Sequence, residues 1–110
     1  MKLDQLAKEL SLCHVCGSLD KEATNVYAGD LLSWVMSHAA EGDVWITIMS
    51  NVNVAAVASL TETACVILAE GVQPDAETVQ AAQQKDVTIF SDSRSAYELC
   101  CSLGAILKNG

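Results

Sequence analysis

Residues Asp43–Leu68 read D-V-W-I-T-I-M-S-N-V-N-V-A-A-V-A-S-L-T-E-T-A-C-V-I-L, and this stretch decides the fold. Its first apolar run, Val44–Ile48, is β-branched or aromatic at nearly every position and does not alternate with polar residues, which is typical of a strand buried on both faces. Val54–Leu60 has the length of a helix and carries no charge, and Cys65–Leu68 is a second buried strand. Two buried strands joined by a helix predict a right-handed parallel crossover.

The rest of the chain predicts further elements on either side of this unit. Apolar residues at helical spacing predict helices over Leu3–Leu10, Leu31–Ala39, Ala76–Lys85 and Ala96–Lys108. Shorter apolar runs predict strands over Ser11–Cys16, Ala23–Ala28 and Val87–Phe90. Because helices and strands alternate, we expect a single α/β domain over residues 1–110, with a small, mainly parallel sheet and helices on its faces.

Composition narrows the classes of function. Of the 110 residues, 51% are apolar and 18% are charged, which suits a folded domain with its own core. The 14 acidic residues outnumber the 6 basic ones and give a net charge of -8, which repels nucleic acids and anionic membrane surfaces. No apolar run reaches the roughly 18 residues of a membrane span, and the charged first helix is not a signal peptide. We therefore expect a cytoplasmic protein.

Polar residues follow three of the predicted parallel strands. Ligands of open α/β sheets collect outside the carboxyl ends of the strands, where helix amino ends offer free backbone N–H groups. The candidate ligand-binding residues at that edge are Ser50, Asn51, Asn53, Gly71, Ser91, Asp92 and Ser93. The alternative is that these residues only cap helices and shape turns.

The helix of the central unit is apolar nearly all round. A helix on the face of a small sheet normally shows water a polar side, so this helix is expected to be covered twice. We predict a homodimer, the commonest symmetric assembly, with the helix at or next to the interface. The candidate interface residues are Val54, Ala55, Val57 and Ala58. The alternative is burial of this helix inside the monomer.

Cys13, His14 and Cys16 form a C-x-x-C pair with a histidine inside it, a pattern that begins some zinc sites and redox pairs. The sequence has no second pair of this kind, and on a strand Cys13 and Cys16 point to opposite faces. It also has no glycine-framed nucleophile and no phosphate-binding glycine loop. We therefore predict a protein without catalytic residues, metal or cofactor. A metal-binding or thiol redox protein is the alternative, and a Cys–His hydrolase is a third hypothesis.

Several segments of the chain resemble the DRTGG domain family. They are Leu19–Tyr27, Asp30–Ser33, Glu41–Ile48 with Asn53, Glu70-Gly71, and the stretch from Ile89 to Tyr97. Asp20 and Thr24 match the motif that names the family. Lys21 replaces its arginine, and Asn25-Val26 stand where two glycines are expected.

The resemblance implies an α/β regulatory module with no established enzymatic activity. Such domains are often appended to CBS domains, including those of some pyrophosphatases, and are similar to the amino-terminal domain of the bacterial phosphocarrier serine kinase. Short versions occur near iron-only hydrogenase genes in anaerobes. We therefore expect a homodimeric regulatory module that senses a small ligand, such as an adenine nucleotide, and that is linked to iron-only hydrogenase or anaerobic energy metabolism.

Overall fold

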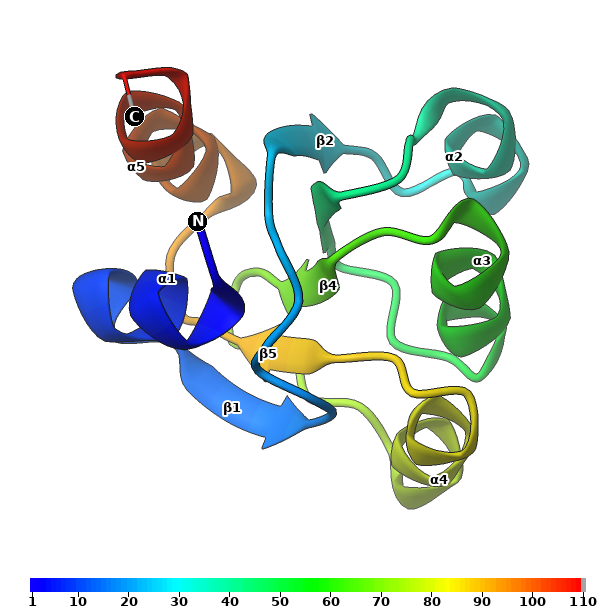
Figure 1. Cartoon of the computed structure of the whole chain (residues 1–110). Coiled ribbons are helices and arrows are strands. Elements are labelled where there is room, and N and C mark those ends of the chain that lie inside the picture. The colour runs from blue at the N-terminus through cyan, green and yellow to red at the C-terminus, as the bar shows by residue number, and fades with distance from the viewer. Residues whose placement is uncertain (110) are drawn as a thin grey trace.

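The computed structural model describes residues 1–109, and the side chains of residues 1–107 (Figure 1). Its strands are β1 (Cys13–Cys16), β2 (Asn25–Ala28), β3 (Asp43–Thr47), β4 (Cys65–Leu68) and β5 (Ile89–Ser91). Its helices are α1 (Leu3–Leu10), α2 (Leu32–His38), α3 (Asn53–Thr61), α4 (Ala76–Gln84) and α5 (Ala96–Asn109). None of the described helices combines the length and the apolar character that crossing a membrane would require.

The five strands form one sheet in the order β1-β5-β4-β3-β2. The pairs β2–β3, β3–β4 and β4–β5 are parallel, and β1 runs antiparallel to β5. Trp45 lies opposite Val66 in the parallel pair β3–β4. The predicted crossover and the predicted α/β class with a mainly parallel sheet are therefore confirmed.

Helices cover both faces of this sheet, with α1 and α5 on one side and α2, α3 and α4 on the other (Figure 1). Side chains alternate between the two cores along each strand. Val44 and Ile46 pack in the core with α1 and α5, whereas Trp45 packs in the core with α2, α3 and α4. Every residue of β3 and β4 is buried, as the unbroken apolar runs predict.

Three strands begin later in the structure than the sequence predicts. Ser11 is in the left-handed region (φ 55°) and its N–H bonds back to α1, so it ends that helix and β1 starts at Cys13. The predicted strand from Ala23 starts at Asn25. The Val87 N–H donates to the Ala82 carbonyl at 2.8 Å, which holds Val87 to the end of α4, and β5 starts at Ile89.

Gly17 follows β1 at a point where two backbones touch. Its φ is +94°, and a Cβ placed there would lie 2.4 Å from the Thr88 Cα. Gly71 has a similar φ of +74° but has no atom within 4 Å of such a Cβ. Substitutions at the two glycines therefore separate the loss of stability caused by a left-handed backbone from the loss caused by a steric clash.

Gly17→Ala should lower the free energy of unfolding by at least about 3 kcal/mol, because the clash with backbone adds to a strained φ. Gly71→Ala should cost only about 1 kcal/mol, because the strained φ acts alone. Urea denaturation of both variants measures the difference. Equal losses of stability in the two variants would contradict the close approach at Gly17.

Candidate functional site

The carboxyl edge of the sheet carries a hollow where four of the predicted ligand-binding residues meet. Its volume is about 310 Å³, and it is lined by Ser11, Cys13, Gly71, Gln73, Ser91, Asp92 and Ser93. Cys13 reaches this edge because β1 is antiparallel, so that its first residue lies opposite Ser91, the last residue of β5. Gly71, Ser91, Asp92 and Ser93 are thus brought together as the carboxyl-edge argument predicts.

Hydrogen bonds between the loops after β4 and β5 build the wall of this hollow. The buried Ser91 hydroxyl donates to the Val72 carbonyl at 2.9 Å and accepts from the Gln73 amide at 2.8 Å. The Gly71 N–H donates to the Asp92 carbonyl at 2.8 Å. Ser91 therefore shapes the hollow, while the exposed Cys13 thiol and Ser93 hydroxyl line its open part.

The Asp92 carboxylate is held by Arg94 in a two-pronged ion pair. Arg94 Nε donates to Asp92 Oδ1 and Arg94 Nη2 to Oδ2, each at 2.7 Å, and the Asp92 side chain is only 7% exposed. Arg94 Nη2 also donates to the Leu10 carbonyl at the end of α1. These hydrogen bonds from Arg94 hold the pKa of the Asp92 carboxyl below its usual value.

Asp92→Asn should lower the free energy of unfolding by about 2 kcal/mol at pH 7, because a charge-assisted, largely buried pair is lost. A depressed folded-state pKa stabilises the fold above the unfolded pKa of about 3.9, and this stabilisation disappears as the pH falls through the folded value. Denaturation curves between pH 7 and pH 2 should therefore show the two proteins converging below about pH 4.

Ser93→Ala serves as the control, because Ser93 is exposed and neighbours Asp92 without sharing its ion pair. It should keep the wild-type pH profile. A constant gap between wild type and Asp92→Asn down to pH 2 would contradict an ionised, Arg94-bound carboxylate.

Ser50, Asn51 and Asn53 lie apart from this hollow. Asn51 Oδ1 accepts the Asn53 N–H at 2.9 Å, and the Ser50 carbonyl accepts the Thr78 hydroxyl at 3.0 Å. Asn53 lines a different, shallow hollow of about 500 Å³ between α2 and α3, together with Leu32, Ser33, Met36, Ala56 and Val57. The Asn51 side chain thus shapes the turn before α3, and ligand contact by any of the seven candidates stays a prediction.

The four candidate interface residues of α3 are buried inside the chain itself. Val54, Ala55, Val57 and Ala58 are each at most 6% exposed, in the core that α3 shares with α2, α4 and the sheet. Neighbouring helices supply the second cover of α3, as the alternative of burial inside the monomer describes, and contact of these four residues with a partner stays a prediction. Leu60, on the same helix, is 71% exposed.

The C-x-x-C pair is divided between two environments. Cys13 is exposed, whereas Cys16 is buried and its thiol donates to the Val87 carbonyl at 3.8 Å. Burial raises the pKa of the Cys16 thiol. His14 Nε2 lies 2.9 Å from the Gly17 carbonyl, and the described residues contain no cluster of three histidine, cysteine or acidic side chains placed to hold a metal ion.

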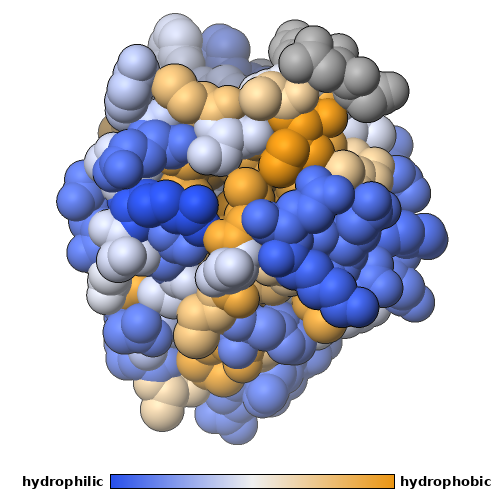
Figure 2. Space-filling view, turned by 90° about the vertical axis from the view of Figure 1, so that its left-hand side faces the viewer, coloured by the Kyte–Doolittle hydropathy of each residue, from blue (hydrophilic) through white to orange (hydrophobic). Residues whose placement is uncertain are grey.

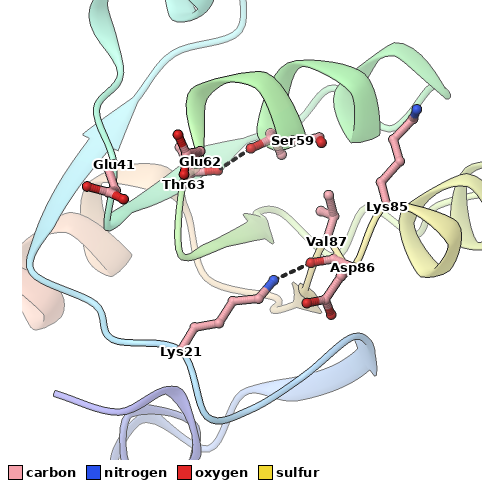
Figure 3. A pocket seen from close by; sticks show the side chains of 9 residues that line it. Lys21, Glu41, Ser59, Glu62, Thr63, Lys85, Asp86 and Val87 are labelled. Carbon is pink, nitrogen blue, oxygen red and sulfur yellow. Dashed lines mark hydrogen bonds between the residues drawn. The ribbon is translucent and has the colours of Figure 1, made fainter.

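A third hollow, of about 250 Å³, lies at the amino edge of the sheet, which the sequence analysis did not predict (Figure 3). Lys21, Glu41, Glu62 and Lys85 line it with Ala58, Ser59, Thr63, Asp86 and Val87. The α3 and α4 helices end here, and such ends are partially negative. Lys21 places a positive charge beside these helix ends, because its ammonium donates to the Asp86 carbonyl. The sequence feature that points to this hollow is an acidic residue after each helix, Glu62 after α3 and Asp86 after α4.

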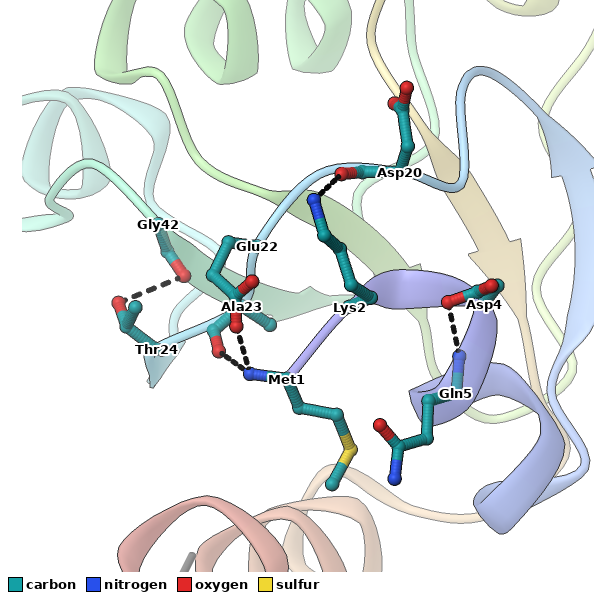
Figure 4. A network of polar contacts seen from close by, with 9 residues as sticks. All are labelled: Met1, Lys2, Asp4, Gln5, Asp20, Glu22, Ala23, Thr24 and Gly42. Carbon is teal, nitrogen blue, oxygen red and sulfur yellow. Dashed lines mark hydrogen bonds and ion pairs between the residues drawn. The ribbon is translucent and has the colours of Figure 1, made fainter.

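The segment that resembles the family motif is held between the start of the chain and β3 (Figure 4). Lys2 Nζ donates to the Asp20 carbonyl at 2.8 Å, and the Met1 amino group donates to the Ala23 carbonyl at 3.0 Å. The Thr24 N–H donates to the Gly42 carbonyl at 2.9 Å. Asn25-Val26, which replace the two glycines of the family, form the first half of β2 rather than a turn.

Neither a family model nor a curated protein matches this chain. Among solved structures, it is similar to a crystal structure of the CBS and DRTGG domains from the regulatory region of the Clostridium perfringens pyrophosphatase, complexed with the activator diadenosine tetraphosphate. The TM-score is 0.60 and the identity 16%, over 88% of this chain and 43% of that chain. This chain thus spans less than half of its structural neighbour, and the likeness shows that it shares its fold with a regulatory region.

Proposed function

We propose that this chain is a non-catalytic regulatory module of the DRTGG kind that senses an adenine nucleotide at the carboxyl edge of its sheet. The observation that carries the proposal is the shared fold over 88% of the chain with a regulatory region complexed with diadenosine tetraphosphate. The altered motif, with Lys21 and Asn25-Val26, does not prevent the fold. A link to iron-only hydrogenase or anaerobic energy metabolism remains a prediction from the family resemblance, and a cytoplasmic location remains a prediction from the sequence.

The hollow lined by Gly71, Ser91, Asp92 and Ser93 is the proposed site. Its 310 Å³ is at the lower end of the range for small-molecule pockets, so it suits one base and not a whole dinucleotide. The Asp92 charge is compensated by Arg94, which leaves hydroxyl, thiol, amide and backbone groups to meet the polar edge of a base. The phosphates of such a ligand would extend into solvent.

The surroundings of the two histidines favour sensing over catalysis. His14 Nε2 lies 2.9 Å from the Gly17 carbonyl, and His38 Nδ1 lies 2.9 Å from the Trp34 carbonyl. His38 Nδ1 also lies 3.0 Å from the Ser37 hydroxyl, but this serine is exposed and bonds the carbonyls of its own helix. A nucleophile and its base need a substrate cavity between them. Neither histidine lines one of the hollows described above.

Thermal unfolding in the presence of AMP, ADP, ATP or diadenosine tetraphosphate tests the site. A ligand at 100 times its dissociation constant should add about 2.7 kcal/mol of stability and raise Tm by several degrees. Ser93→Tyr should abolish this shift by filling the hollow. Ser59→Tyr, at another exposed serine, in the amino-edge hollow, should keep it.

A Tm that none of these nucleotides raises at millimolar concentration would remove the ligand from the proposal. A shift that survives Ser93→Tyr but is lost in Ser59→Tyr would move the site to the amino edge of the sheet.

We further propose that the module acts as a homodimer. Several large apolar side chains lie on the surface of the chain, among them Leu31 (67% exposed), Trp34 (56%) and Leu60. Exposed apolar patches on small proteins commonly mark interfaces. Sedimentation of the wild-type chain should give twice its mass of 11.6 kDa. A monomer at the highest soluble concentration would contradict this part of the proposal alone.

A further inference from the structure

The strand β2 leaves one side of the sheet open. It is last in the strand order and, within the described residues, pairs with β3 alone. Because the Gly29 N–H donates to the Ile46 carbonyl of β3 at 3.1 Å, alternation along the strand directs the backbone groups of Asn25 and Tyr27 to β3. Those of Val26 and Ala28 therefore face the open side. The described chain supplies no backbone partner for them.

This open edge lacks the usual protection against pairing. Natural edge strands carry charges, prolines or bulges, whereas β2 reads Asn-Val-Tyr-Ala. The nearest acid, Asp30, is turned inward, where its Oδ1 accepts the Thr47 hydroxyl at 2.8 Å and the Ile48 N–H at 3.0 Å. On a chain of net charge -8, an uncharged strip is where two identical copies can approach each other without repulsion.

Exposed apolar side chains flank the edge on the α2 side. Residues of a helix advance by about 100°, so with Val35 facing the sheet, Leu32 and Met36 fall on one side of α2 and Leu31 and Trp34 on the other. Leu32 and Met36 line the hollow shared with α3. Leu31 and Trp34 therefore lie on the side away from α3, beside the open edge. The Trp34 ring is stacked on His38 at 3.9 Å, which holds it as a rigid anchor.

The other flank is a groove between β2 and α5. It has a volume of about 400 Å³ and is lined by Asn25, Val26, Ala28, Cys100, Gly104 and Leu107. A Cβ on Gly104 would meet no atom within 4 Å, so the groove is open at this point. Figure 1 shows β2 at the upper edge of the sheet between α5 and α2, and Figure 2 shows apolar side chains gathering toward α5.

We infer that two copies of this chain join edge to edge through β2, about a two-fold axis, into one continuous ten-stranded sheet. The inference rests on the proposed homodimer and names its surface. A two-fold axis makes the two β2 strands antiparallel. With the axis at Tyr27, Val26 pairs with Ala28 of the partner subunit, and the outward groups of both residues form four hydrogen bonds. Trp34 and the β2–α5 groove pack at the two flanks of this junction.

Sedimentation velocity of the full chain and three variants tests this surface. Trp34→Glu should weaken dimerisation at least about 10-fold, because it removes an aromatic anchor and places like charges near the axis. Ala28→Pro should also give monomers, because it removes an outward N–H that the inner ladder does not use. Leu60→Glu, which alters another exposed apolar residue, on α3, is the matched control and should leave the dimer intact.

Trp34 is exposed, so Trp34→Glu should keep the wild-type fold by circular dichroism and decides the test even where Ala28→Pro does not fold. A wild-type dimer that survives Trp34→Glu but dissociates in Leu60→Glu would overturn the β2 edge as the interface and leave the homodimer standing. A monomeric wild type would overturn both, while nucleotide binding would be unaffected.

Discussion

The parallel pairing of β3 with β4 is the constraint on which the rest of this structure depends. Both strands are apolar at nearly every position and buried throughout, so both of their faces must be covered by helices. With Trp45 opposite Val66, the indole packs in the core with α2, α3 and α4 and its N–H donates to the Gly29 carbonyl at 2.9 Å. A shift of the β3–β4 register by one residue would move the side chains of each core to the other face of the sheet. It would also leave the Trp45 indole N–H without its acceptor.

The same pairing makes the two ends and the two sides of the sheet unlike one another. Parallel strands bring the loops after β4 and β5 to one end, where hydrogen bonds from Gly71 and Ser91 form the proposed ligand hollow. The sheet ends at β1, beside β5, and at β2 on the far side. The proposed ligand site and the proposed partner surface therefore belong to different strands, so each can be altered without touching the other.

The sequence predicts the elements and the class because long apolar runs and helical stripes depend on local physics. It also predicts that Gly71 and Ser93 meet, since carboxyl ends of parallel strands share an edge. It does not predict that Asn53 lies apart, because that depends on β4 standing between β3 and β5. Likewise, the apolar surface of α3 indicates a second cover, but only the packing shows that α2 and α4 supply it. The free edge at β2 also depends on strand order.

Interstrand backbone contacts measured by nuclear Overhauser effects test the central pairing most directly. Parallel strands in the observed register predict contacts that advance in the same direction along both strands, from Val44 with Cys65 to Trp45 with Val66 and Ile46 with Ile67. Contacts that run in opposite directions along β3 and β4, or that shift by one residue, would contradict the sheet from which both proposed surfaces are derived.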